Sequence, residues 1–193
     1  MVKRFLVVGG LVFLASLLLT GFTQEAAAAV PPLPAASLLI LVIASGIFFD
    51  VIGVAAAAAS EKDLHALAAD RVPGAVQAIR LVRRRDLVAT VTCDMIGDIL
   101  GTIGGAMGAT LAAQLSLPGV LQETVVRSAL IVAATAGLTV GGKAGFKQVA
   151  LRYNQDIVLL LGRVLALVES VVGRSLLNDR RAGRRIRRRA RRR

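Results

Sequence analysis

Four long apolar runs, each with no more than two charged side chains, set the strongest limit on the fold of this chain. They cover residues 5–22, 35–59, 87–113 and 124–142. A helix needs about 20 apolar residues to cross the hydrocarbon core of a membrane. Apolar residues make up 55% of the 193-residue sequence, which is high for a soluble domain. The sequence therefore predicts an all-α integral membrane protein.

The first run allows two interpretations. Lys3 and Arg4 precede an uncharged stretch, and small residues follow at 26–28. Residues 1–28 are thus either a signal peptide or a first membrane span. Both alternatives place residues 23–34 outside the cytoplasm. The stretch AAAAVPPLP that follows predicts a short external linker, since its prolines disfavour helix.

The distribution of basic residues predicts the topology. Spans are expected at about 35–59, 87–113 and 124–142. Basic residues occur at the N-terminus, in 62–85 and after 143, and both external loops lack them. The positive-inside rule then gives three spans, or four with the first run, and a cytoplasmic C-terminus. The protein is expected in the cell membrane.

Two amphipathic segments, 60–85 and 146–177, are predicted to lie at the membrane surface. In the first, Ser60 and Asp63 have the spacing of a capping box, and Pro73-Gly74 predicts a break between two short helices. The second is apolar but interrupted by charges. A charge at mid-bilayer costs about 2.5–3.5 kcal/mol on insertion scales, which favours an interfacial helix over a span.

Three carboxylates lie at membrane depth: Asp94 and Asp98 on one helix face, and Asp50 on the preceding span. Ionised carboxylates in hydrocarbon must be paired, protonated or bound to a cation. Lys143 and Lys147 are the nearby charge-balancing residues. Since hard cations prefer oxygen ligands, the three aspartates are the predicted metal ligands. Weaker candidates are Ser45, Thr90, Thr102 and the backbone of Gly142.

The predicted ligand is Mg²⁺ or another cation as a transported substrate, with no tightly bound cofactor. Two alternatives remain open: a buried ion-pair network around Lys143 that carries no ion, and a proton relay. The first would make the chain a structural or regulatory membrane subunit. GxxxG spacings, such as Gly104–Gly108 and Gly137–Gly141, allow close packing of helices.

From about residue 35 to 177, the sequence resembles the transmembrane domain of the CNNM/CorC family, which is implicated in Mg²⁺ export. The resemblance lies in the stretch SGIFFDVIGVAAAAASEKD, in Asp94 and Asp98 at an N-x-x-x-N spacing, and in GGKAGFKQVALRYNQDI. It implies a three-span domain with juxtamembrane helices, and a homodimer.

The sequence also departs from this family pattern. Asp50 stands at a small polar position, Gly53 at an acidic one, and Lys143 and Phe146 replace a Glu and a Pro. The CBS-pair module of the family is not expected here. Because the ligand set differs, Lys143 could fill the place of the ion.

Ten of the 24 basic residues are arginines in the last 14 positions. Residues 178–193 are expected to be a cytoplasmic tail that either is a solvated segment fixing the orientation of the chain or binds anionic lipid headgroups, at about 1 kcal/mol per basic residue. The candidate lipid-binding residues are Arg184, Arg185, Arg187, Arg188 and Arg189. The tail lacks aromatic stacking residues, so nucleic acid is not expected as a partner.

No catalytic motif accompanies these features. The sequence has no H-E-x-x-H, no G-x-S-x-G and no P-loop. Asp50 and Asp94 could form the aspartate pair of an intramembrane protease, but the motifs that usually flank such aspartates are absent. The chain is therefore not expected to be an enzyme.

Overall fold

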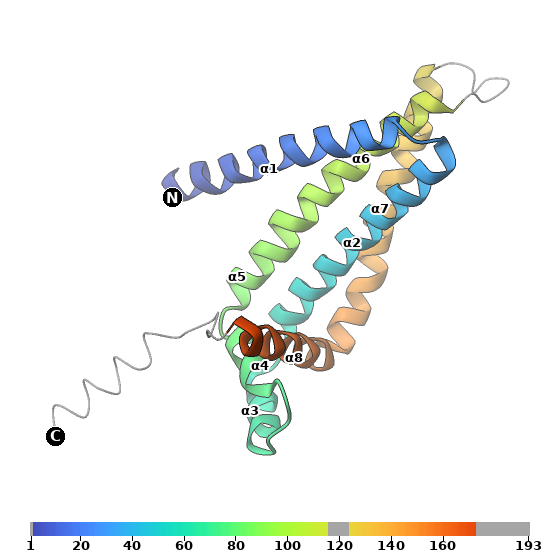
Figure 1. The fold of residues 1–193 in the computed structure, drawn as a ribbon. Coiled ribbons are helices and arrows are strands. Elements are labelled where there is room, and N and C mark those ends of the chain that lie inside the picture. Colours follow the sequence, from blue (N-terminus) through green and yellow to red (C-terminus); the bar gives the residue numbers. More distant parts are fainter. Residues whose placement is uncertain (1, 116–123, 173–193) are drawn as a thin grey trace, which may run out of the picture. The chain divides into compact units, whose positions relative to one another are not determined.

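The computed structural model describes residues 2–115 and 124–172, and these fold almost entirely into helices, without a strand (Figure 1). The helices are α1 (Val2–Ala28), α2 (Pro32–Ala58), α3 (Glu61–Ala69), α4 (Ala75–Val82), α5 (Arg85–Ala89), the π-helix η1 (Thr90–Gly97), α6 (Asp98–Gln114), α7 (Thr124–Arg152) and α8 (Asn154–Val172). The prediction of an all-helical chain is confirmed.

The helices form two compact units. The spanning unit comprises the described residues of Met1–Ala58 and Arg85–Asn154. The amphipathic unit comprises Ala59–Arg84 and the described residues from Gln155 onward. Among the described residues, four helical segments are long and apolar enough to cross a membrane, and all belong to the spanning unit: Leu6–Ala28, Pro32–Ala58, Arg85–Gln114 and Val125–Arg152. The chain therefore has the composition and helix lengths of a multi-pass membrane protein.

The helix ends differ in two places from the expected ones. The linker after the first run is only three residues long, 29–31, because Pro32 occupies the start of α2, where a missing N–H costs nothing. The last span was expected to end at 142 and an interfacial helix to begin at 146. Instead α7 continues without a break to Arg152, and α8 begins at Asn154.

Aliphatic side chains from three helices make the core of the spanning unit. Its buried members are Ala27 from α1, Ala35, Leu39 and Ile43 from α2, and Ile99, Ile103, Met107 and Leu111 from α6. The α6 residues recur every four positions, which places them on one face of the helix. This face holds α6 against α2, while the end of α1 packs beside it.

Only some of the glycines at GxxxG spacing lie at contacts between helices. A Cβ atom at Gly104 would lie against Ile43 and Leu39 of α2, and one at Gly108 would lie 2.6 Å from Thr135 Oγ1 of α7. By contrast, a Cβ at Gly101, Gly105, Gly137 or Gly141 would meet nothing within 4 Å. Within the described residues, Gly104–Gly108 is thus the GxxxG pair that brings helices close together.

In the amphipathic unit, α8 packs against α4 and the turn before it, and Gln155 of α8 donates a hydrogen bond to Asp63 of α3. The predicted break is confirmed at Gly74, whose φ of +86° places it in the left-handed region that favours glycine. Gly162 of α8 lies against the Gly74 carbonyl and Ala78. An ion pair between Arg80 and Glu169, at 3.4 Å, also joins α4 to α8.

Ser60 stands at the N-cap of α3, as predicted, but its side chain makes no capping hydrogen bond. The expected capping box is therefore absent. Glu61 instead accepts a 2.7 Å hydrogen bond from Arg83 Nε and lies 3.2 Å from His65 Nε2. Hydrogen bonds from Arg83 and then His65 lower the pKa of Glu61 below its ordinary value.

Substitution of Gly108 by alanine should destabilise the spanning unit, because the stiff β-branched side chain of Thr135 would have to shift. Overpacking costs about 1–3 kcal/mol, and alanine gains about 0.8–1 kcal/mol in helix propensity. We expect Gly108→Ala to unfold at lower denaturant than wild type in detergent. Gly105→Ala is the matched control and should be neutral or stabilising. Equal stability of the two variants would contradict the close α6–α7 contact.

Candidate functional site

The third candidate span is not a uniform α-helix. Residues Thr90–Gly97 form a π-helix, whose backbone hydrogen bonds run from i to i+5. The Thr92 hydroxyl adds a hydrogen bond to the Val88 carbonyl at 2.9 Å. Such π segments are rare and frequently occur at functional sites. This one carries Asp94 and ends where α6 begins with Asp98.

A close approach between α2 and η1 fixes the backbone beside Asp50. A Cβ atom on Gly53 would collide with Cys93 Sγ and Thr92 Oγ1. The Cys93 thiol donates to the backbone carbonyl of Asp50 across a distance of 3.5 Å. Only a glycine at 53 lets the two helices meet at this separation.

Lys143 brings the predicted residues of three helices together. Its Nζ atom lies 4.0 Å from Asp50 Oδ1 of α2 and 4.0 Å from Asp98 Oδ1 of α6. The side chains of Lys143 and Asp50 are 25% and 18% exposed, whereas that of Asp98 is 71% exposed. The ammonium group therefore lies between two carboxylates, one half-buried and one accessible.

Asp94 does not join this cluster. It is exposed and forms no ion pair with a described residue. Across 2–115 and 124–172, no group of three or more His, Cys, Asp or Glu side chains is placed to hold a metal ion. The three-aspartate ligand set remains a prediction. Two of its members, Asp50 and Asp98, lie near Lys143.

The weaker candidates also lie along these helices. Ser45 donates its hydroxyl hydrogen to the Leu41 carbonyl, and Thr102 donates to the Asp98 carbonyl at 2.9 Å. Their oxygen lone pairs remain able to accept. Thr90 opens the π-helix, and Lys147 is exposed one turn beyond Lys143. The Gly142 backbone lies against Ile47 of α2.

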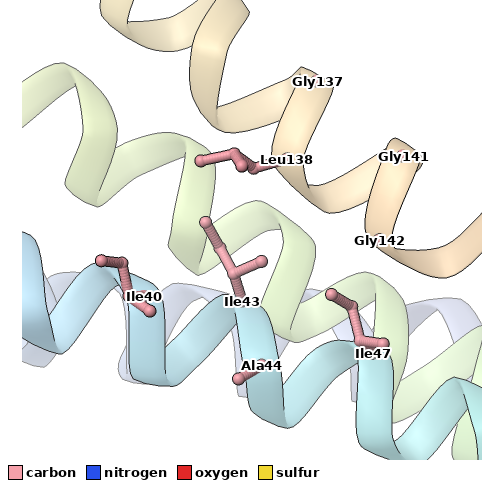
Figure 2. Close-up of a pocket in the computed structure, with 8 residues that line it drawn as sticks. All are labelled: Ile40, Ile43, Ala44, Ile47, Gly137, Leu138, Gly141 and Gly142. Atoms are coloured by element: carbon pink, nitrogen blue, oxygen red, sulfur yellow. The ribbon is translucent and has the colours of Figure 1, made fainter. Parts of the chain in front are cut away.

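An apolar cavity of about 510 Å³ lies between α2 and α7 (Figure 2). Its lining consists of Ile40, Ile43, Ala44, Ile47, Gly137, Leu138, Gly141 and Gly142. None of these side chains carries a polar atom. The cavity is therefore no site for an ion, although its Ile47–Gly142 end is close in sequence to Asp50 and Lys143.

Two residues that position the site, Gly53 and Cys93, were missed in the sequence interpretation. Gly46 and Gly53 are both buried on α2 and are seven residues apart, two helical turns. That spacing was an available signal of a tightly packed face. The arginines proposed to bind lipid, 184–189, lie outside the described residues.

Comparison of the chain with family models, with curated proteins and with solved structures finds no match. The functional argument therefore rests on the residues of the chain and on their arrangement.

Alanine at Gly53 should open the contact that positions Asp50. The added methyl group would force Thr92 and Cys93 away from α2. We expect Gly53→Ala to make Cys93 several-fold more reactive toward a maleimide in detergent, because the thiol would lose its packing against α2. Gly46→Ala is the control, since its Cβ would meet Leu100 Cβ at an ordinary 3.4 Å. An unchanged Cys93 reaction rate in Gly53→Ala would refute this account.

Proposed function

We propose that the chain is a multi-pass membrane protein that binds and transports a cation, with a divalent ion such as Mg²⁺ as the substrate. Asp50 and Asp98 are its carboxylate ligands, and Lys143 occupies the space between them when no ion is bound. The observation that carries this proposal is the position of Lys143 Nζ, 4.0 Å from both carboxylates.

The length of these two contacts supports a displaceable ammonium. Strong charge-assisted hydrogen bonds between nitrogen and carboxylate are about 2.7–2.9 Å long. At 4.0 Å, Lys143 balances charge without a direct hydrogen bond to either oxygen. A cation with two positive charges, entering through the accessible Asp98 side, would compete for the same oxygens.

The charge balance of the cluster supports a cation as well. Two ionised carboxylates and one ammonium leave one negative charge, and the exposed Asp94 adds another nearby in the sequence. Mg²⁺ typically keeps several water ligands and is bound through one or two carboxylates. Two carboxylates, one of them accessible, suit a hydrated ion better than an all-protein cage.

The resemblance to the CNNM/CorC transmembrane domain supports the same substrate class and a homodimer. The basic residues in 62–85 and after 143 support a cytoplasmic position for the amphipathic unit. On this topology, the cluster lies toward the cytoplasmic ends of α2 and α7, since Asp50 and Lys143 are each within ten residues of those ends.

A second candidate function has the same observation in its favour. Lys143 already stands between Asp50 and Asp98, so the cluster could be a fixed ion-pair network in a structural or regulatory subunit. In that case, the three groups hold α2, α6 and α7 in register, and no ion enters.

Ion titration of the wild type and of a Lys143 variant separates the two functions, because the fixed network takes up no ion. We expect Lys143→Gln to bind Mg²⁺ more tightly than wild type in a calorimetric titration, since the competing ammonium is gone. Asp50→Asn and Asp98→Asn should each weaken binding about tenfold or more through loss of a charged ligand. Asp86→Asn, an exposed carboxylate earlier in the same span, is the control and should bind as wild type.

Flux of Mg²⁺ into proteoliposomes, followed with an internal dye, then tests transport. Wild-type flux no greater than that of Asp50→Asn would end the transport proposal. Absence of saturable binding in both wild type and Lys143→Gln, together with a stable Asp98→Lys/Lys143→Asp double variant, would establish the fixed network instead.

A further inference from the structure

One side of α8 exposes a continuous stripe of aliphatic side chains. Its members are Leu160, Val164, Leu167, Val168 and Val171, which are 59%, 51%, 67%, 41% and 86% exposed. Their spacings of four, three, one and three residues place them within about one third of the helix circumference. A stripe of five large apolar side chains that no described part of the protein covers requires an explanation.

The remaining sides of α8 are already accounted for within the amphipathic unit. Val158 is fully buried, and Gly162 packs against Gly74 and Ala78 of the α4 segment. Glu169 pairs with Arg80. These contacts fix the rotation of α8 about its axis, so the stripe is turned away from α4.

A polar strip borders the stripe. Asp156, Arg163 and Ser170 recur every seven residues along α8, and all three are exposed. The helix thus has an apolar side and a polar side next to each other, in addition to its packed side. This pattern is typical of a helix that lies in the plane of a membrane surface.

The connections of the chain indicate what covers the stripe. The amphipathic unit is joined to candidate spans at three places: after Ala58, before Arg85 and after Arg152. Only Tyr153 separates α7 from α8. A unit tied three times to the ends of membrane helices is held at the boundary between bilayer and water.

We propose that the stripe of α8 is a lipid-binding surface that inserts into the adjacent leaflet of a phospholipid bilayer. The five aliphatic side chains lie among the acyl chains, and Arg163 reaches the level of the headgroups. The amphipathic unit is then seated on the membrane through α8, independently of any ion bound by the spanning unit.

Spin labels on the full-length protein in nanodiscs test this proposal. In a Cys93→Ser background, single cysteines are introduced as Val164→Cys and Leu167→Cys on the stripe, and as Asp156→Cys and Ser170→Cys on the polar strip. The collision rates of each label with O₂, which is enriched in lipid, and with a water-soluble nickel chelate are measured. Labels on the stripe should lie about 5–10 Å below the headgroups, and those on the polar strip should be accessible to nickel.

Two results would overturn the proposal. Nickel access at 164 and 167 equal to that at 156 and 170 would place the stripe in water. Protection of 164 and 167 from both O₂ and nickel would mean that protein covers the stripe, either this chain or a second copy. A spin–spin distance below about 20 Å between equivalent labels would identify a second copy as the occupant.

Discussion

The spanning unit depends on the way in which charged groups are accommodated at membrane depth. An ionised side chain taken out of water loses several kcal/mol of hydration, and only well-placed partners compensate for that loss. Here one ammonium, that of Lys143, lies between carboxylates from two other helices. Because a single group serves two partners, α2, α6 and α7 must converge at this point of the spanning unit. The side chain of Asp98 is 71% exposed, so the protein covers only part of this cluster.

The positions of most helices in the spanning unit could be predicted from the lengths of the apolar runs, because a membrane requires about the same helix length of every span. The helical structure of residues 143–152 could not be predicted in this way. Basic residues are typical of the end of a span, yet α7 continues past Lys143 and Lys147 to Arg152. Long basic side chains can extend toward water while their aliphatic stems stay against apolar neighbours, so a helix need not end where its charges begin. The expected capping box is absent for a different reason: Ser60 makes no capping hydrogen bond, and the Asp63 carboxylate accepts a hydrogen bond from Gln155 of α8.

Lys143 lies near two of the three predicted aspartates, and the π-helix accounts for the separate position of the third. The expectation that Asp94 and Asp98 act together assumed 3.6 residues per turn. In η1 the hydrogen bonds span five residues, so the faces of the helix shift at the point where the two aspartates meet. Asp98, at the start of regular helix, reaches Lys143, while Asp94 stays apart. No local sequence signal predicted the π segment, in which Thr92 and Cys93 pack tightly against Gly53 of α2.

This packing also bears on how an ion could enter. Gly53 and Gly108 hold α2 and α7 against the third span at separations that leave no room for an added methyl group. Helices packed so closely move with difficulty, since interiors transmit strain instead of absorbing it. Lysine, by contrast, carries its charge on a flexible four-carbon stem. Under the proposed function, exchange of the ammonium for a cation would require rotation of the Lys143 side chain and would leave the positions of Asp50 and Asp98 unchanged.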